Sequence, residues 1–371
     1  MSGQQAKGPQ PPQGKRAPSA TTGSGRRVTI LDVAERAGVS VSAVSKVVRG
    51  AYGVSQQMQT RVTSAIEELG YRPHAGARTM RGRSYTVGVV LAELTSPFPM
   101  EVAKGVSDAL QDTPFQDLIV PGGLTPERQT HSIEALLDRQ VDGLVLVAPW
   151  LDAHAIEKFA KVVPTVTIAL HGSPVGFDTV VDDERLGARL MVDYLVANGH
   201  RRIVHTSMPS AAWEKQFVLS HTARRQGFAQ AMRSHGLEPD IIETWYSEEG
   251  GHDAAFEALS RPKPPTAIFA GADISALGVL RAAEERGLRV PGDLTVVGYD
   301  NIYASTINRV SLTTVDQSGQ HTGEAGVRLL MERIEGRTDP QTFVVAPKLV
   351  VRGTSGPPAK RTKRPSPHTT S

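Results

Sequence analysis

From Thr86 onward, short runs of aliphatic and β-branched residues alternate with longer stretches whose apolar residues repeat at helical spacing. The expected strands are 87–91, 118–120, 144–147, 166–169, 203–205, 268–270 and 294–298, and the expected helices include 102–111, 128–139, 186–198, 224–235 and 274–286. This alternation predicts an α/β body of βαβ units with parallel sheets covered on both faces. Because these strands are too many for one compact sheet, we expect two doubly wound parallel-sheet lobes with a ligand cleft between them.

Residues 28–72 carry a smaller pattern, which predicts an all-α head of three short helices. The predicted N-caps are Thr29, Ser40 and Ser55, and the predicted C-terminal glycines are Gly38 and Gly70. Asp32 follows Thr29 by three residues and would complete a capping box. The first two helices and their glycine turn therefore have the spacing of a helix-turn-helix.

One face of the helix-turn-helix segment VTILDVAERAGVSVSAVSKVV is small and aliphatic, and the other is mostly polar. The expected buried residues are Val33, Ala34, Val39, Val44 and Val47, and the outward ones are Val41, Ser42, Ser45, Lys46 and Arg49. A recognition helix presents such outward residues to base edges in the major groove of DNA. An ordinary helical hairpin with a solvated face has the same pattern, so both interpretations stand at this point.

Charge is divided unevenly along the chain, although the net charge is only +3. Residues 1–85 hold 13 Lys and Arg against 4 Asp and Glu, whereas residues 86–353 hold 24 against 34. A basic head on an acidic body is typical of a chain whose head meets nucleic-acid phosphate. A solvated basic arm is the alternative.

Both ends of the chain are rich in Gly, Pro and Ser. We expect residues 1–27 to form a disordered basic arm and residues 354–371 a disordered basic tail. The tail contains no Leu, Ile, Val or Phe, so it cannot form a coiled coil.

Several function classes lack their sequence signals. We expect neither a membrane span nor a signal peptide, because no run of eighteen apolar residues occurs and no apolar stretch follows the basic N-terminal residues. The chain has no cysteine, which excludes disulfides and thiolate sites and suits a cytoplasmic protein. No catalytic or metal-binding motif is found, so we expect neither an enzyme nor a cofactor.

Between residues 28 and 353 the sequence resembles the lactose/galactose repressor family of bacterial transcriptional regulators. The head and hinge carry this likeness in VTILDVAERAGVSVSAVSKVV and VSQQMQTRVTSAIEELGYRPHAGARTMRG, and the body carries it in VGVVLAELTSPFPMEVAKGV, ANGHRRIVHTS, ARRQGFAQAM and VPGDLTVVGYDN. The resemblance implies a homodimer that binds a pseudo-palindromic double-stranded DNA operator. It also implies a body of the periplasmic-binding-protein type I architecture.

The resemblance assigns DNA contacts in the head. Base readers would be Val41, Ser42 and Lys46, and phosphate contacts would come from Thr29, Ser40, Ser45 and Ser55. The family often has Arg in place of Lys46, and Val41 can offer only apolar contact, for instance to a thymine methyl.

Residues 73–85 correspond to the family's hinge, which wedges an apolar side chain into the minor groove. Met80 takes the wedge position, next to Ala77, and Arg78 is placed for a phosphate contact. A plain basic linker is the alternative.

In the body the resemblance places Arg224 and Asp300 in the effector cleft, where each could bind two polar groups of a ligand. Phe98 and Ser220 are further effector-binding candidates. The alternatives are a salt bridge between Arg224 and Asp300 across the lobes, and a core position for Phe98. Ala272 stands where relatives often carry Asn or Ser, which removes one polar contact. The chain should cross between lobes near Val181, Val310 and Pro340.

The function expected from these features is an effector-controlled transcriptional regulator, a repressor in the first instance. A sugar or sugar derivative is the favoured effector, with a purine or a phosphorylated partner protein as alternatives. A solute-binding protein for a transporter would need a signal peptide and no basic head. An enzyme would need a catalytic constellation. The tail lacks a leucine repeat that could join two dimers, so we expect a dimer and not a tetramer.

Overall fold

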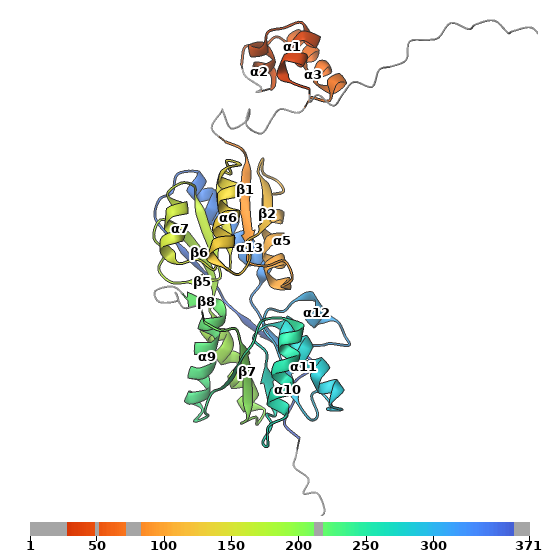
Figure 1. Ribbon diagram of the computed structural model, residues 1–371, viewed down its shortest axis with the longest axis vertical. Coiled ribbons are helices and arrows are strands. Elements are labelled where there is room, and N and C mark those ends of the chain that lie inside the picture. The colour runs from red at the N-terminus through yellow and green to blue at the C-terminus, as the bar shows by residue number, and fades with distance from the viewer. Residues whose placement is uncertain (1–27, 49–51, 72–82, 211–217, 360–371) are drawn as a thin grey trace, which may run out of the picture. The chain divides into compact units, whose positions relative to one another are not determined.

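The computed structural model describes residues 28–48, 52–71, 83–210 and 218–359 (Figure 1). The chain divides into two compact units, Met1–Arg81 and Gly82–Ser371. The predicted N-terminal arm and hinge residues Ala77, Arg78 and Met80 lie outside the described residues. No described helix is long and apolar enough to cross a membrane.

The head consists of α1 (Ile30–Ala37), α2 (Val41–Val48) and α3 (Gln56–Leu69). Thr29 and Asp32 form the predicted capping box, with the Thr29 N–H donating to Asp32 Oδ2 at 2.7 Å. The predicted C-terminal glycines Gly38 and Gly70 both adopt the left-handed backbone conformation that glycine tolerates best. The predicted ends of the first and third helices are thus confirmed.

A small core joins the three head helices. It consists of Val33, Ala34, Ala37, Val44, Val62, Ala65 and Tyr71, with Val39 and Val47 packed partly buried against it. The Arg61 guanidinium donates to the carbonyls of Ala37 and Gly38, and so fixes the turn between α1 and α2. Apolar packing in the head core and the hydrogen bonds of Arg61 therefore both stabilise the relative orientation of α1 and α2.

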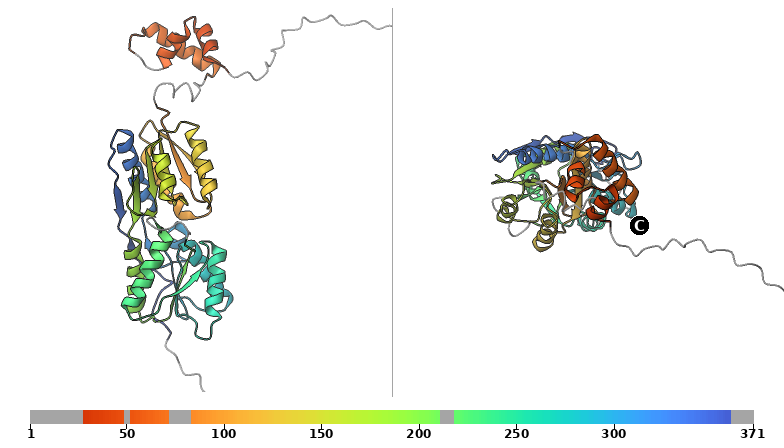
Figure 2. Two further views of the ribbon diagram at one scale, coloured as in Figure 1. Left: turned by 60° about the vertical axis from the view of Figure 1, so that its left-hand side comes forward. Right: turned by 90° about the horizontal axis from the view of Figure 1, so that it is seen from above.

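The N-terminal lobe of the body is built on a six-stranded parallel sheet in the order β13-β6-β4-β3-β1-β2. The strands are β1 (Thr86–Leu91), β2 (Gln116–Pro121), β3 (Gly143–Val147), β4 (Thr165–Ile168), β6 (Asp178–Asp182) and β13 (Thr342–Val345). Its helices are α5 (Pro97–Leu110), α6 (Pro126–Leu137), α7 (Ala153–Ala160) and α13 (Gly319–Ile334). Figure 2 shows helices on both faces of this sheet, as the alternating pattern predicts.

The C-terminal lobe has a four-stranded parallel sheet in the order β11-β10-β7-β9. The strands are β7 (Ile203–Ser207), β9 (Asp240–Glu243), β10 (Ala267–Phe269) and β11 (Thr295–Val297). Its helices are α8 (Glu184–Ala197), α9 (Ser220–Ser234), α10 (Glu248–Leu259), α11 (Asp273–Glu285) and the short α12 (Tyr303–Thr306). The two lobes confirm the prediction of two doubly wound sheets.

Two antiparallel strand pairs complete the body. One joins β5 (Leu170–His171) to β8 (Val218–Leu219), close to the junction of the lobes in Figure 1. The other joins β12 (Thr314–Asp316) to β14 (Lys348–Val350), and single bridges connect β12 to the region of β11. These short elements lie where the chain passes between lobes.

The chain crosses between the lobes three times. The first crossing follows β6 at Asp182, as expected near Val181. The other two lie later than predicted: β12 still bridges to the C-terminal lobe up to Asp316, and Pro340 precedes β13, which pairs with β6 in the N-terminal lobe. Both errors arise because short strands at a lobe junction carry little sequence pattern.

The predicted start of the disordered tail at Thr354 is wrong. Thr354 is buried: its hydroxyl accepts a hydrogen bond from the Thr313 N–H at 2.9 Å, and its carbonyl accepts from the Val296 N–H. Gly356 exchanges hydrogen bonds with the Thr295 hydroxyl. Backbone and hydroxyl groups, not apolar side chains, hold this segment, so a composition argument could not detect it.

Candidate functional site

The outward face of α2 carries the residues predicted to read DNA. Val41 is 37% exposed, Ser42 and Lys46 are exposed, and Ser45 is partly exposed. Val44, on the opposite face, is fully buried in the head core. The exposed residues of α2 therefore lie on one face of the helix, and the opposite face packs against the head core. A recognition helix requires this arrangement.

Three of the four hydroxyls predicted to contact phosphate, those of Thr29, Ser40 and Ser55, lie at helix starts, and the fourth, Ser45, lies in the middle of α2. Ser40 Oγ accepts from the Ala43 N–H at 3.2 Å and is 2.9 Å from Ser42 Oγ, while Ser55 Oγ accepts from the Met58 N–H at 3.3 Å. Helix N-termini favour anions, because their first N–H groups lack helical partners. Thr29, Ser40 and Ser55 therefore stand at positions suited to phosphate, in addition to their capping role.

A cavity of about 110 Å³ lies between the two lobes of the body. All four predicted effector residues, Phe98, Ser220, Arg224 and Asp300, line it. The other lining residues are Ala92, Glu93, Ser96, Pro99, Leu124, Val147, Ala148, Trp150, Ala169, Met208, Leu219, His221, Tyr246, Ala272 and Gln317. The structure therefore brings together side chains that are far apart in sequence, from Ala92 to Gln317.

Arg224, on α9, forms a bidentate ion pair with Glu184 at the start of α8. Its Nε donates to Glu184 Oε2 at 2.7 Å and its Nη2 donates to Oε1 at 2.9 Å. Nη1 donates to the Gly271 carbonyl, and the guanidinium carbon lies 3.6 Å from the centre of the Tyr299 ring. Burial disfavours the charged form of Glu184, but the adjacent guanidinium outweighs it and lowers the pKa of this carboxyl.

The alternative of a salt bridge between Arg224 and Asp300 is therefore wrong, because Arg224 pairs with Glu184. Asp300 instead accepts a hydrogen bond from the Gln317 side-chain amide. Burial raises the pKa of Asp300 well above its usual value, so the carboxyl is stabilised in its neutral form. Its backbone φ of 122° is unusual for a residue with a side chain, and such conformations are concentrated at binding sites.

Phe98 and Ser220 face the cavity from different sides. Phe98, near the start of α5, is partly buried and packs against the core of the N-terminal lobe as well as lining the cavity. Ser220 Oγ donates to the Ala169 carbonyl at 3.3 Å and lies 3.2 Å from His171 Nε2. Phe98 is therefore both a cavity residue and a residue packed against the core, the two positions expected for it as alternatives.

Sequence reasoning missed an aromatic group at the cavity. Trp150, after β3, stacks on His221 of α9 with ring centres 6.3 Å apart, and it lies 6.2 Å from Trp245, after β9. Tyr246 also lines the cavity, and burial raises its pKa to about 12. For Trp150 the available signal was its place shortly after the predicted strand 144–147, because strand ends point into the cleft, whereas no strand was predicted before Trp245 and Tyr246.

Three ligand atoms of the kind that bind metals lie close together behind the cavity, on His171, Asp182 and Glu184. Both Glu184 oxygens are already bound by Arg224, and Asp182 Oδ2 accepts from the Tyr299 hydroxyl at 2.8 Å. Burial also lowers the pKa of His171 and raises that of Asp182. The guanidinium thus takes the place that a cation would need, and the cluster does not fit a metal.

Comparison with known proteins adds two family matches. The description "Bacterial regulatory proteins, lacI family" fits residues 29–74, and "Periplasmic binding protein-like domain" fits residues 192–355. The first match covers the helix-turn-helix head, and the second covers most of the C-terminal lobe with its share of the cavity.

Similarity to individual proteins extends over nearly the whole described chain. Catabolite control protein A of Priestia megaterium is 32% identical over 325 residues, covering 86% of this chain and 96% of that protein. The ribose operon repressor of Escherichia coli (strain K12) is 31% identical over 334 residues, covering 88% and 99%. The solved structure of the lac repressor dimer, bound to operator and the anti-inducer ONPF, has a TM-score of 0.77 with 27% identity, covering 89% and 100%.

Proposed function

The chain belongs to the lacI family of bacterial regulatory proteins, DNA-binding transcriptional regulators, and we propose that it is a repressor controlled by a sugar or sugar derivative in the interlobe cavity. The observation that carries this proposal is the cavity itself. It is enclosed by both lobes, and its lining combines apolar and aromatic side chains with a few polar groups. Sugars present both apolar ring faces and hydroxyls, so such a lining suits them.

The proposed control follows from the position of the cavity. A ligand that contacts both lobes binds best to one relative lobe position, and therefore shifts the population toward it. We propose that the protein is a homodimer whose two heads bind the halves of a pseudo-palindromic operator. A change in lobe position would then alter the separation of the heads and so the match to both half-sites.

For the DNA contacts we propose the assignments made from the sequence. The base readers are Val41, Ser42 and Lys46, supported by the exposure of this face of α2. The phosphate contacts are Thr29, Ser40, Ser45 and Ser55. Ala77, Arg78 and Met80 of the hinge complete the set, with Met80 as the minor-groove wedge.

We infer further that the protein is not an enzyme. Both carboxyls among the described residues that line the cavity accept hydrogen bonds, Asp300 from the Gln317 side-chain amide and Glu93 from the Thr95 hydroxyl at 3.1 Å, so neither is placed as a free acid or base. Because its ligand is operator DNA, we also infer that the protein acts in the cytoplasm, where the bacterial chromosome lies.

One experiment tests both DNA binding and its control by a sugar. The full-length protein is used to select binding sites from random DNA, and its affinity for the selected site is measured by fluorescence anisotropy with and without a panel of neutral sugars. We expect a palindromic site and a sugar that changes its affinity. Trp150 lines the cavity and should report the same sugar by a change in tryptophan fluorescence, and the ring of Trp245 lies 6.2 Å from it. Selection of no DNA site would reject the regulator, and a purine response without a sugar response would reject the sugar.

Variants then test the residue assignments. Ser42→Ala should alter preference at particular base pairs, with a loss of roughly 1 to 3 kcal/mol for each lost base contact. Lys46→Ala should lower the affinity for the selected site. Unchanged site preference and affinity in both variants would reject the recognition-helix assignment.

A further inference from the structure

We propose that the cavity is selective for an effector without negative charge, and that Glu184 is the residue that sets this selectivity. The inference rests on the proposed function, since it concerns the effector of the same cavity. It separates neutral sugars from sugar phosphates and sugar acids, which the family assignment does not.

The cavity offers one fixed cation. Among the described residues that line it, Arg224 is the sole Lys or Arg. Its side chain is only 4% exposed, and that of Glu184 is only 1% exposed. A negatively charged effector would therefore have to use this guanidinium.

The guanidinium is already committed to protein groups. Nε and Nη2 form the two parallel hydrogen bonds of the fork to Glu184, and Nη1 is bonded to the Gly271 carbonyl. One face is covered by the Tyr299 ring at 3.6 Å. Since the fork that recognises phosphate or carboxylate is the one that Glu184 occupies, an anionic effector would have to displace a buried carboxylate.

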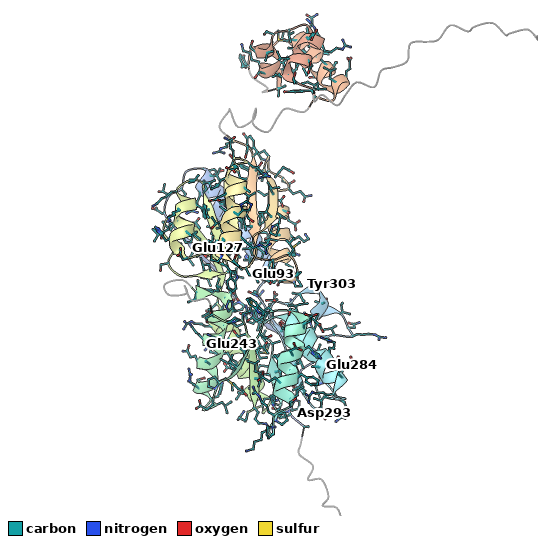
Figure 3. All side chains as sticks on the ribbon, viewed as in Figure 1. Glu93, Glu127, Glu243, Glu284, Asp293 and Tyr303 are labelled. Atoms are coloured by element: carbon teal, nitrogen blue, oxygen red, sulfur yellow. The ribbon has the colours of Figure 1, made fainter. Side chains whose placement is uncertain are left out.

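The other described residues that line the cavity include no Lys or Arg to replace it. Glu93 and Asp300 bring two more carboxyls to the lining, and Glu93 lies at the junction of the lobes in Figure 3. The N-terminus of α9 at Ser220 favours an anion, but it amounts to roughly half a charge. An anion brought here would meet carboxyls with no unpaired guanidinium or ammonium to offset its lost hydration.

Matched pairs of probes test this on the wild-type protein. Ribose is compared with ribose 5-phosphate, and glucose with glucose 6-phosphate and gluconate, by titration calorimetry on the full chain. The neutral member of any pair that binds should bind roughly ten- to a hundredfold more tightly. A phosphorylated or acidic member that binds as tightly as its neutral partner would overturn the proposal.

Three variants locate the effect at Glu184. Glu184→Gln removes the carboxylate and should shift the preference toward the phosphorylated member by roughly tenfold or more. The double variant Glu184→Gln with Arg224→Gln removes both charges and should keep the wild-type preference. Glu243→Gln is the matched control, because it removes a carboxylate bound at 2.6 Å to the neighbouring Arg225 on the surface. It should change nothing.

Inorganic sulfate serves as an anionic probe, so the charge proposal can be tested even if no sugar binds. If no sugar binds the wild type, the sugar proposal fails, but the charge proposal is still decided by the shift in Tm that sulfate produces. Sulfate stabilises proteins generally, so the comparison is between variants. We expect a larger shift in Glu184→Gln than in the wild type, the double variant and Glu243→Gln. Equal shifts in all four would overturn the proposal, and if Glu184→Gln does not fold, the wild-type pairs decide alone.

Discussion

The N-terminal lobe meets the cavity mainly with apolar side chains, whereas the C-terminal lobe meets it with most of the polar ones. The first group is Ala92, Phe98, Pro99, Leu124, Val147, Ala148 and Trp150, and the second is Ser220, His221, Arg224, Tyr246 and Asp300. The buried ion pair between Glu184 and Arg224 also lies within the C-terminal lobe, because α8 and α9 both belong to it.

This difference bears on the proposed change in lobe position. A buried ion pair is costly to break, since each separated charge would be left without its partner. Kept within one lobe, the pair survives any change in lobe position. Apolar contacts are non-directional and can be remade at a slightly different angle, so they suit the lobe that moves against it.

Breaking the pair should have the largest effect. Arg224→Ala leaves Glu184 buried and uncompensated, so we expect the free energy of unfolding to fall by about 3 to 5 kcal/mol. We also expect this variant to lose its response to the effector, while its DNA affinity in the absence of ligand stays nearly intact. Urea unfolding of the full chain measures it. Arg225→Ala, which breaks the exposed pair with Glu243, should cost less than about 1 kcal/mol. Equal losses would mean that burial of the Arg224 pair contributes nothing.

Phe98 tests the apolar side of the comparison. Phe98→Ala should lower effector affinity roughly tenfold, while stability falls by about 1 to 2 kcal/mol because the ring is only partly buried. Phe177→Ala is the control: Phe177 is fully buried away from the cavity lining, so about 3 to 5 kcal/mol of stability should be lost. Calorimetric titration and urea unfolding separate the two effects. A loss of stability in Phe98→Ala without a loss of affinity would make Phe98 a core residue only.

The head and the cavity differ in how far sequence could predict them. The helix boundaries of the head depend on neighbouring residues: Thr29 caps with Asp32 three positions later, and Gly38 ends the same helix. Such local signals can be read from a single sequence. The alternation of strands and helices predicted the two sheets for the same reason.

The charge network of the cavity depended on contacts that no local pattern contains. Glu184 opens α8 forty residues before Arg224, and Gln317 follows β12 seventeen residues after Asp300. The resemblance to the family gave Arg224 and Asp300 but not their partners, and it left the Arg224–Asp300 pair open. Choosing the correct partner required knowing which helix starts meet in space.

Tyr299 links the two lobes and should give a smaller effect. Its hydroxyl donates at 2.8 Å to Asp182, the last residue of β6 before the first crossing. Tyr299→Phe keeps the ring over Arg224 but leaves a buried carboxyl oxygen without its donor, so we expect a loss of about 1 to 3 kcal/mol by urea unfolding. Tyr303→Phe alters a side chain that is 79% exposed and should change stability by less than about 0.5 kcal/mol. If both variants matched the wild type, this hydrogen bond would not stabilise the junction.

Glu101 is a partly buried carboxyl of the N-terminal lobe, and it gives the smallest predicted effect. It lies on α5, and burial together with the charges of Asp316 and Asp273 raises its pKa to about 7, although the Tyr303 N–H partly opposes this shift. The folded protein therefore keeps this proton up to about pH 7, whereas the unfolded chain releases it near the ordinary value of 4.5. Between these values folding takes up a proton, so the contribution of Glu101 to stability declines as pH rises.

Glu101→Gln cannot lose a proton, so the decline in Tm between pH 4.5 and 7 should be shallower in this variant, and its Tm above pH 7 should exceed that of the wild type. The effect is small because the side chain is only partly buried and solvent screens its neighbours. Glu127→Gln on the exposed start of α6, labelled in Figure 3, removes the same charge from an exposed position of the same lobe. Thermal unfolding of the three proteins over this pH range is the measurement. Parallel curves for the wild type and both variants would show that no proton is taken up at Glu101, and the N-terminal side of the junction would then act through its apolar contacts alone.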